Sequence, residues 1–470
     1  MSNITSLLKN NSEHFQVLTL AGKIAAKEKI PCYLVGGYVR DKLLNRKTTD
    51  VDIMVEGDAI SYAKKLSSKL GIGKVVEFED FGTARIPGKN FEIEVASARS
   101  ESYSKESRNP KIELSTFKDD MSRRDFTINA IAASIHPESF GELHDPFGGI
   151  KDLHKGLIIT PLDPDSTFDD DPLRMLRAIR FAAQLKFSIA PNILESISRI
   201  KNRIEIISWE RITNEITKIL KSDTPSIGFY ALRDTGLLNI LLPEFSIMGG
   251  VETIQNMGHK DVFIHTLQVI DNAAELTDKM EVRFAALVHD IAKPQTKKFI
   301  SGKGWTYHAH EIVGINLMKK LAKRMKLSNE LRDYLCKLIK LHLRPIALAK
   351  KGVTDSAVRR VMVAAGEDID DLMILCRADI TTKNPKKVKQ YMNNFERVEE
   401  MVQNVKLRDE MKAFQSPVRG AEIMEIFKLK PGKDVGKIKT AIEEAILDGD
   451  IENNYDSAYK FMMNLKKTTT

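Results

Sequence analysis

The segment Leu34-Val35-Gly36-Gly37-Tyr38-Val39-Arg40-Asp41 decides the fold of the first part of this 470-residue chain. The apolar run at 33–35 predicts a short buried strand, two glycines end it, and residues 38–44 have helical spacing. A strand, a glycine turn and a helix in this order direct backbone N–H groups toward an anion, so the pattern predicts a phosphate site. We expect Arg40 to add donors to the same phosphates.

Two carboxylates follow in Asp50-Val51-Asp52, where a second strand is predicted over residues 51–55. Its three apolar residues share one face, and Asp50 and Asp52 share the other because strand side chains alternate. Carboxylates two positions apart are separated by about 6–7 Å along a strand. They can therefore hold two divalent cations about 3.5–4 Å apart, one to activate a hydroxyl and one to hold a leaving pyrophosphate.

The two motifs together resemble the signature of the nucleotidyltransferase (polymerase β) superfamily. LVGGYVRD is most similar to its branch of tRNA nucleotidyltransferases and bacterial poly(A) polymerases. The resemblance implies that Asp50 and Asp52 are catalytic ligands of Mg²⁺. It also implies that Gly36, Gly37 and Arg40 hold a nucleoside triphosphate.

Glu94 is the candidate for a third catalytic carboxylate. The family commonly carries one on a neighbouring strand, five residues before an arginine, and Glu94 precedes Arg99 by five. Alternation in the strand predicted at 91–95 places Glu92 and Glu94 on the same face. The alternative interpretation is that both are solvated glutamates on an open face.

A third motif, RRDFTINA, begins at Arg123. We predict that Ser122 caps a helix whose first turn holds Arg123, Arg124 and Asp125. Arginine matches phosphate geometry and a carboxylate accepts from a ribose hydroxyl. The resemblance to the same motif in these enzymes implies that all three residues contact the nucleotide. A charged helix start without further function is the alternative.

The segment DDDPLRMLR at 169–177 predicts a base-selecting pair. Pro172 suits the first position of a helix, which makes Asp171 the N-cap and places Arg174 on the same face. A carboxylate accepts from an exocyclic amine while an arginine donates to a ring nitrogen, so the pair fits cytosine or adenine and opposes uracil or guanine. The resemblance is to an EDxxR element, with Asp170 in place of Glu, and implies that Asp171, Arg174 and Arg177 contact the nucleotide. A capping role alone is the alternative for Asp171.

Histidines and aspartates of the second half resemble the HD-type metal phosphohydrolase superfamily, in which a His, an adjacent His-Asp pair and a later Asp bind a divalent metal. The resemblance implies a site made of His265, His289, Asp290 and Asp379, with His310 and His342 as further members. Imidazole and carboxylate ligands suit Mn, Ni, Zn or Fe. Such a site would hydrolyse phosphoesters; a scaffold that only holds RNA is the alternative.

Composition agrees with an RNA-binding protein inside a reducing compartment. A net charge of +8 and a pI near 9.0 favour an acidic partner. The three cysteines lie far apart, which predicts free thiols. The N-terminal residues lack a signal pattern and no apolar run approaches 18 residues, so we expect a cytoplasmic protein without membrane segments. No feature requires an obligate protein partner.

The predicted fold class is α+β. We expect a polymerase-β-like nucleotidyltransferase head with a mixed sheet and helices at 1–150, including a helix capped by Asp58. An all-α neck at 151–250 would select bases and bind RNA, an HD-type helical body would occupy 251–383, and a helical tail at 384–470 would bind tRNA. Few strand signals occur beyond Asn192.

The predicted activity is template-independent addition of CCA to the 3′ end of tRNA from CTP and ATP, with Mg²⁺ and release of pyrophosphate, and an added phosphohydrolase activity at the HD site. One alternative is poly(A) synthesis, or addition of only CC or only A; the absence of a long basic C-terminal extension favours tRNA over arbitrary RNA. The others are an HD phosphohydrolase with a relic head and a non-catalytic RNA-binding protein.

Overall fold

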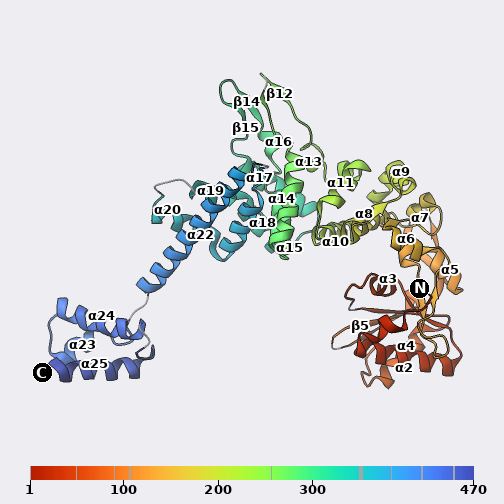
Figure 1. Ribbon diagram of the computed structural model, residues 1–470, viewed down its shortest axis with the longest axis horizontal. Helices are drawn as coiled ribbons and strands as arrows, with labels where there is room; N and C mark the ends of the chain where they lie inside the picture. Colours follow the sequence, from red (N-terminus) through yellow and green to blue (C-terminus); the bar gives the residue numbers. More distant parts are fainter. Residues whose placement is uncertain are drawn as a thin grey trace. The chain divides into compact units, whose positions relative to one another are not determined.

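A computed structural model describes residues 2–48, 50–88, 90–104, 107–255, 257–348, 353–382, 384–413, 416–447 and 450–469. Met1, Lys383 and Thr470, which bound predicted domains, lie outside this set. The chain divides into two compact units: residues 1–343 with 367–388, and residues 344–366 with 389–470. The mixed head followed by helices is the α+β fold class expected from the sequence (Figure 1).

The first unit opens with a seven-stranded sheet in the order β3-β4-β5-β2-β1-β8-β9. Only β2 and β5 pair in parallel; the other neighbours are antiparallel. The strands are β1 (Cys32–Val35), β2 (Val51–Val55), β3 (Val76–Phe78), β4 (Thr83–Pro87), β5 (Glu92–Ser97), β8 (Ala132–Ser134) and β9 (Leu143–His144). A separate hairpin, β6 (Arg99–Ser104) with β7 (Ser107–Leu114), follows β5.

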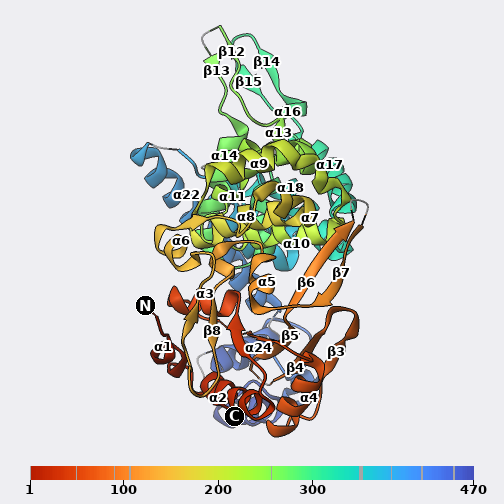
Figure 2. The ribbon, with the colours of Figure 1, turned by 90° about the vertical axis from the view of Figure 1, so that its right-hand side faces the viewer.

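One face of this sheet is buried by helices and the other carries the polar residues. Helices α2 (Ser12–Glu28) and α4 (Ala59–Lys69) pack against Ile53 and Val95 in the main core of the head (Figure 2). Asp58 caps α4, as predicted, by accepting from the N–H groups of residues 60 and 61. Because side chains alternate, Asp52 points to the face opposite Ile53.

In the part that the structure describes, the head contains four further short helices and two 3₁₀ turns. They are α1 (Thr5–Lys9), α3 (Gly37–Leu43), α5 (Phe117–Ser122) and α6 (Gly149–Lys155), with 3₁₀ turns η1 (Glu79–Phe81) and η2 (Thr127–Asn129). The neck consists of α7 (Pro164–Asp170), α8 (Leu173–Leu185), α9 (Pro191–Ile200), η3 (Lys201–Ile206), α10 (Trp209–Leu220), α11 (Ser226–Asp234), α12 (Leu237–Leu241) and α13 (Pro243–Ser246). Short strands β10 (Leu157–Ile158) and β11 (Ser188–Ile189) pair in parallel beside α8.

The HD body contains α14 (Val262–Leu276), α15 (Met280–Val288), α16 (Lys293–Thr296), α17 (His310–Arg324), α18 (Asn329–Leu341) and α21 (Ile369–Ala378), which η4 (Gly366–Asp368) precedes. Two hairpins project from it (Figure 2), although the sequence predicted few strands here. They are β12 (Thr253–Ile254) with β13 (Met257–Gly258), and β14 (Lys298–Ile300) with β15 (Gly304–Thr306). Strands of two or three residues are too short to produce a detectable alternation.

The second unit contains α19 (Arg344–Leu348), α20 (Asp355–Ala365), most of α22 (Pro385–Ala413), α23 (Gly420–Phe427), α24 (Lys433–Leu447) and α25 (Tyr455–Thr469). Its last three helices share an apolar core that includes Ile423, Ile442 and Met462. All three cysteines of the chain are free and buried, as predicted. Among the described residues, no helix combines the length and the apolar character that a bilayer crossing requires.

Candidate active site and metal centre

A cavity of about 810 Å³ in the first unit is lined by the sheet of the head and by helices of the neck. It gathers every head and neck residue predicted to be functional except Asp50, which is exposed just before β2. These residues are Gly36, Gly37, Arg40, Asp52, Glu94, Arg123, Arg124, Asp125, Asp171, Arg174 and Arg177. Motifs separated by more than 130 positions in the sequence thus line the same cavity.

The glycine turn lies directly beside the acidic strand. Gly36 follows β1 with a φ of +67°, which favours glycine, and Gly37 begins α3. A Cβ atom on Gly36 would lie 3.0 Å from Arg124 Nη1 and 3.6 Å from Asp52 Oδ2. The absent side chain therefore leaves room for a ligand between an arginine and a carboxylate.

Asp52 and Glu94 are direct neighbours because β2 and β5 pair in parallel with Asp52 opposite Glu94. Burial and the adjacent Glu94 carboxylate raise the pKa of Asp52 to about 6. Paired carboxylates of this kind suit an oxygen-preferring cation such as Mg²⁺, which offsets their mutual repulsion. The residues present therefore fit a divalent metal at this edge of the cavity.

Arg40 forms part of the cavity wall but already has protein partners. Its guanidinium donates to Asn129 Oδ1 at 2.7 Å and to both carboxylate oxygens of Asp41 at 2.9 and 3.0 Å. It also lies 4.9 Å from the Phe181 ring centroid. Arg40 is thus fixed in position before any phosphate arrives.

The helix start predicted at Ser122 is wrong. Helix α5 ends at Ser122, because Thr116 and Asp119 form a capping box upstream and set the start of the helix there. Arg123 and Arg124 instead follow the helix, and both pair with Asp120, which is buried. Burial would raise the pKa of Asp120, but the two guanidinium groups lower it.

Asp125 is buried, and its carboxylate is engaged on both oxygens. Oδ2 accepts from Arg177 Nε at 2.7 Å, and Oδ1 accepts from Asn129 Nδ2 and the Phe126 N–H, each at 2.9 Å. Burial would raise the pKa of Asp125, but Arg177 and Asn129 lower it to about 2. The pair Asp125–Arg177 joins the head to α8 of the neck.

Asp171 and Arg174 both line the cavity, but in this structure they do not form the pair predicted. Arg174 donates to the carbonyl oxygens of Thr167 and Arg123 at 3.3 and 2.7 Å. Asp171 accepts from Arg211 at 3.2 Å. Helix α8 begins at Leu173, one position later than predicted, yet Asp171 still accepts from the Leu173 N–H at 3.2 Å. The carbonyl groups attract the arginine because they are buried acceptors beside it.

Sequence reasoning missed two supporting residues, Asp120 and Arg211. Asp120 stands three and four positions before the arginines that it holds, and that charge spacing is detectable in the sequence. Arg211 stands 40 positions from Asp171, so no local pattern connects them.

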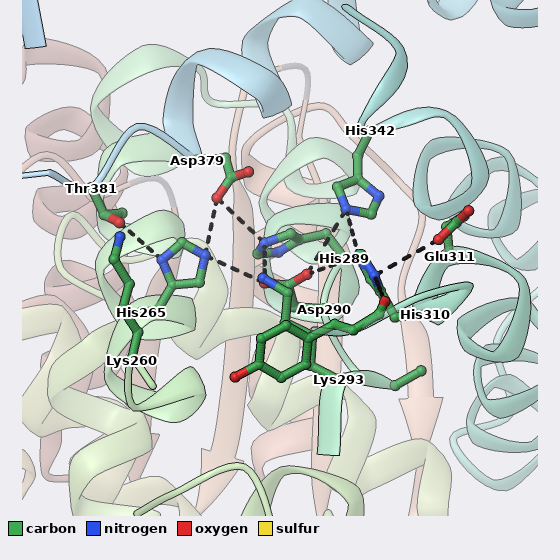
Figure 3. A network of polar contacts seen from close by, with 12 residues as sticks. Lys260, His265, His289, Asp290, Lys293, His310, Glu311, His342, Asp379 and Thr381 are labelled. Carbon is green, nitrogen blue, oxygen red and sulfur yellow. Dashed lines mark hydrogen bonds and ion pairs between the residues drawn. The ribbon is translucent and has the colours of Figure 1, made fainter. Parts of the chain in front are cut away.

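The HD residues lie at or near the ends of five helices, and Figure 3 shows their side chains gathered in one network. His265 lies in α14, His289 and Asp290 follow α15, and His310 begins α17. His342 and Asp379 directly follow α18 and α21. All the predicted HD residues, including the two further histidines, therefore come together.

Every histidine in the cluster is oriented by a contact on Nδ1. His265 Nδ1 contacts Thr381 Oγ1 at 2.9 Å. The Nδ1 atoms of His289, His310 and His342 contact backbone carbonyls at 2.8, 2.8 and 2.6 Å. With Nδ1 engaged, Nε2 is the atom directed toward a ligand, and the Nε2 atoms are the ones that converge.

The cluster contains two potential ligand groups, the first made of His265, His289 and Asp379 and the second of Asp290, His310 and His342. Asp290 faces both groups. Its Oδ2 is 3.1 Å from His289 Nε2 and 3.4 Å from His265 Nε2. Its Oδ1 is 3.4 Å from His310 Nε2 and 3.8 Å from His342 Nε2. Asp379 completes the first group at 3.0 Å from His265.

The donor set fits one or two transition metals. His289 and Asp290 are buried with Nε2 3.1 Å from Oδ2, and Lys293 Nζ lies 2.5 Å from the same Asp290 oxygen. A buried carboxylate needs positive charge nearby, which Lys293 supplies in part and a metal cation would complete. Burial would lower the pKa of His289, but Asp290 and Asp379 raise it to about 10. Burial lowers the pKa of His342 to about 4. A metal would replace the proton on His289.

Comparisons with known proteins place these sites in a family. Residues 32–159 match the model of the poly A polymerase head domain, residues 186–248 that of a probable RNA and SrmB-binding site of polymerase A, and residues 262–384 that of the HD domain. The first region carries the head residues of the cavity, and the third carries the histidine cluster. Asp171, Arg174 and Arg177 lie between the first and second regions.

The multifunctional CCA protein of Nitrosospira multiformis is 33% identical over 341 residues, which cover 67% of this chain and 76% of that protein. The A-adding tRNA nucleotidyltransferase of Halalkalibacterium halodurans is 38% identical over 236 residues, 49% of this chain and 55% of that protein, so the chain spans about half of this relative.

A solved tRNA nucleotidyltransferase in complex with a primer tRNA and an incoming ATP analog superimposes with a TM-score of 0.60 at 26% identity, over 81% of this chain and 99% of that one. The similarity in sequence and in fold covers the parts of the chain that contain the cavity and the histidine cluster. The chain belongs to the family of CCA-adding tRNA nucleotidyltransferases and bacterial poly(A) polymerases that carry an HD domain.

Proposed function

We propose that this chain adds CCA to the 3′ end of tRNA without a nucleic-acid template, consuming CTP and ATP and releasing pyrophosphate. The observation that carries the proposal is the single cavity that joins the glycine turn and carboxylates of the head to Asp171 and Arg174 of the neck. A cavity of about 810 Å³ is large enough for a nucleoside triphosphate. The free cysteines support action in the cytoplasm.

In this proposal Asp52 and Glu94 hold Mg²⁺, and Asp50, at the exposed start of β2, supplies a further carboxylate. Mg²⁺ supplies activation of the tRNA 3′-hydroxyl and stabilisation of the leaving pyrophosphate. Gly36 and Gly37 present backbone N–H groups to the triphosphate. No side chain acts as a nucleophile, because the attacking group is the hydroxyl of the RNA.

The arginines that line the cavity would bind the nucleotide electrostatically. Arg123 and Arg124 face the triphosphate while Asp120 fixes them, which limits the entropy lost on binding. Arg40 and Arg177 contribute positive potential from positions held by Asp41 and Asp125. The saturated carboxylate of Asp125 supports a positioning role for that residue.

Asp171 and Arg174 would select the base once a nucleotide enters. Asp171 would accept from the exocyclic amine of cytosine or adenine, and Arg174 would donate to the adjacent ring nitrogen. For this, Arg174 exchanges a carbonyl contact for the base, and Arg211 keeps Asp171 oriented. Uracil and guanine present the opposite donor and acceptor pattern.

The deciding experiment incubates the full chain with tRNA lacking its terminal CCA and with each nucleoside triphosphate separately, then sizes the products. We expect two additions from CTP alone, one further addition when ATP follows, and none from UTP or GTP. Long A tails on any RNA would instead identify a poly(A) polymerase. A single A on tRNA ending in CC, without CMP addition, would identify an A-adding enzyme.

A second candidate activity is metal-dependent phosphoester hydrolysis at the HD cluster, and the four converging Nε2 atoms around Asp290 favour it. His265, His289, Asp290 and Asp379 would hold a metal such as Mn²⁺ or Ni²⁺, with His310 and His342 extending the site. The metal supplies a nucleophilic hydroxide at neutral pH. The test is hydrolysis of p-nitrophenyl phosphate by the Mn²⁺-loaded chain, which His289→Ala should abolish.

A further inference from the structure

A second cavity of about 740 Å³ opens beside the HD cluster and is walled by the paired hairpins β12–β13 and β14–β15. Two members of the first ligand group, His265 and Asp379, form its inner end. The other lining residues are Met257, Gly258, His259, Lys260, Val262, Lys293, Lys303, Gly304, Trp305 and Tyr307. Any substrate of the cluster that enters through this cavity must touch the hairpins.

The chemistry of the lining is both cationic and aromatic. Lys260 and Lys303 supply two ammonium groups, and Lys293, which also lines the cavity, pairs with Asp290 at 2.5 Å. Asp379 is the single acid among the described residues that line the cavity. Figure 3 shows Lys260 together with His265 at one end of the network. Ammonium groups near a metal site suit phosphate, and aromatic rings beside them suit a nucleobase.

Trp305 is held rigidly in the hairpin wall. Its indole N–H donates to the Met257 carbonyl at 2.9 Å, which connects β15 to β13. His259 packs edge-on at 5.0 Å between ring centroids. Gly304, which precedes Trp305, is buried with a φ of +83°, a backbone conformation that favours glycine. An aromatic ring fixed in this way loses little entropy when a base stacks on it.

A salt bridge braces the same wall. Lys297 lies 5.4 Å from the Trp305 ring centroid and pairs with Glu252, which connects β14 to the start of the first hairpin. Lys298, the next residue, is exposed and does not line the cavity. The hairpins therefore offer a matched pair of lysines, Lys303 inside the cavity and Lys298 outside it.

We propose that the paired hairpins form the nucleoside-recognition wall of the HD site, with Trp305 stacking on the base and Lys260 and Lys303 binding the phosphate of a nucleoside phosphoester. Binding of the nucleoside does not depend on the proposed HD activity; hydrolysis of the bound phosphoester does. The source of the nucleoside is either a free mononucleotide or the phosphorylated 3′ end of an RNA, since both carry the same chemistry.

The first test uses the two tryptophans of the chain, Trp209 and Trp305. In a full-length Trp209→Phe variant, the fluorescence reports on Trp305 alone. We expect saturable quenching by 3′-AMP, by a short RNA with a 3′-phosphate, or by both, but not by ribose 5-phosphate or inorganic phosphate. Lys303→Glu should weaken this binding at least about tenfold, whereas Lys298→Glu should leave it within about twofold.

Equal responses to 3′-AMP and ribose 5-phosphate, or equal losses in the two lysine variants, would overturn the proposal. Quenching by 3′-AMP identifies a free mononucleotide as the source of the nucleoside, and quenching by the short RNA identifies the 3′ end of an RNA.

The second test separates recognition from hydrolysis in the Mn²⁺-loaded chain. Trp305→Ala should lower the ratio of kcat/KM for 3′-AMP to that for p-nitrophenyl phosphate about tenfold, and Trp305→Phe should restore most of it because a ring remains. An unchanged ratio in Trp305→Ala would overturn the proposal. Absence of any hydrolysis by the wild-type chain, with quenching by 3′-AMP intact, would reject the HD activity and retain the nucleoside wall.

Discussion

The two sites of the first unit differ in how their charges are balanced. In the head and neck cavity, the arginines already have carboxylate or carbonyl partners, as Arg177 has Asp125 and Arg174 has the Arg123 carbonyl. In the HD cluster, His289 and Asp290 are buried with Nε2 3.1 Å from Oδ2, and Lys293 Nζ lies 2.5 Å from the same oxygen. The cavity is therefore organised by charge pairs before its nucleotide arrives, whereas the cluster brings together two groups of ligand atoms that a bound cation would stabilise.

Inactivating each site separately tests whether the two sites act independently. Asp52→Ala should lower the rate of nucleotide addition by about 10³-fold or more, because it removes a ligand for the ion that stabilises the transition state. It should leave p-nitrophenyl phosphate hydrolysis intact, and His289→Ala should do the reverse. Product sizing and a colorimetric assay measure the two activities.

Glu92→Ala is the matched control for Asp52→Ala, since Glu92 is exposed on the strand beside β2 and does not line the cavity. Loss of both activities in either the Asp52 or the His289 variant would refute two independent sites.

Asp290→Asn should weaken metal binding by about 100-fold, because Asp290 faces both ligand groups. Wild-type protein should gain thermal stability on addition of Mn²⁺, by about 2.7 kcal/mol at a hundredfold excess over Kd, and the variant should gain almost none. Asp333→Asn, an exposed change on α18, should respond like the wild type. Equal rises in Tm for wild type and Asp290→Asn would reject the metal centre.

In the absence of Mg²⁺, we expect the ionised Asp52 carboxylate to lower the free energy of unfolding at neutral pH. Its folded-state pKa of about 6 is higher than the ordinary value of 3.8, so the folded state binds the proton more tightly, and stability falls as pH rises from 4 to 6. Asp52→Asn should therefore raise the free energy of unfolding at pH 7 by up to about 3 kcal/mol. Denaturant unfolding at pH 4 and pH 7 measures this.

The gain from Asp52→Asn should shrink when Mg²⁺ is added to both proteins, since only the wild type has the full carboxylate site. A variant less stable than the wild type at pH 7 without Mg²⁺ would contradict the assigned environment.

Arg174→Ala should relax the choice of base more than it weakens RNA binding. One bidentate base contact contributes about 1–3 kcal/mol of discrimination, so the preference for CTP over UTP should fall by about 10- to 100-fold. Single-turnover incorporation of each nucleotide gives the ratio. Arg199→Ala, an exposed change in the same neck, should leave the ratio unaltered. Unchanged selectivity in Arg174→Ala would leave Asp171 with a capping role alone.

The sequence alone determined the features that depend on neighbouring residues. The strand, glycine turn and helix around Gly36, the capping of α4 by Asp58 and the placement of Asp52 on the face opposite Ile53 all follow from local geometry. The HD residues were predicted from a resemblance in their type and order along the chain, not from local geometry, and the structure brings them together. The prediction at Ser122 was wrong because a stronger local signal, the capping box at Thr116, lay just upstream.

Contacts between residues far apart in the sequence became known only from the tertiary structure. The parallel pairing of β2 with β5 brings Glu94 beside Asp52, and Arg211 reaches Asp171 across 40 positions. The same is true of Asp290, whose two oxygens face different histidine groups. Helix caps and strand alternation are set within a few residues, but strand order and buried ion pairs are set by the packing of the whole unit, which local patterns do not encode.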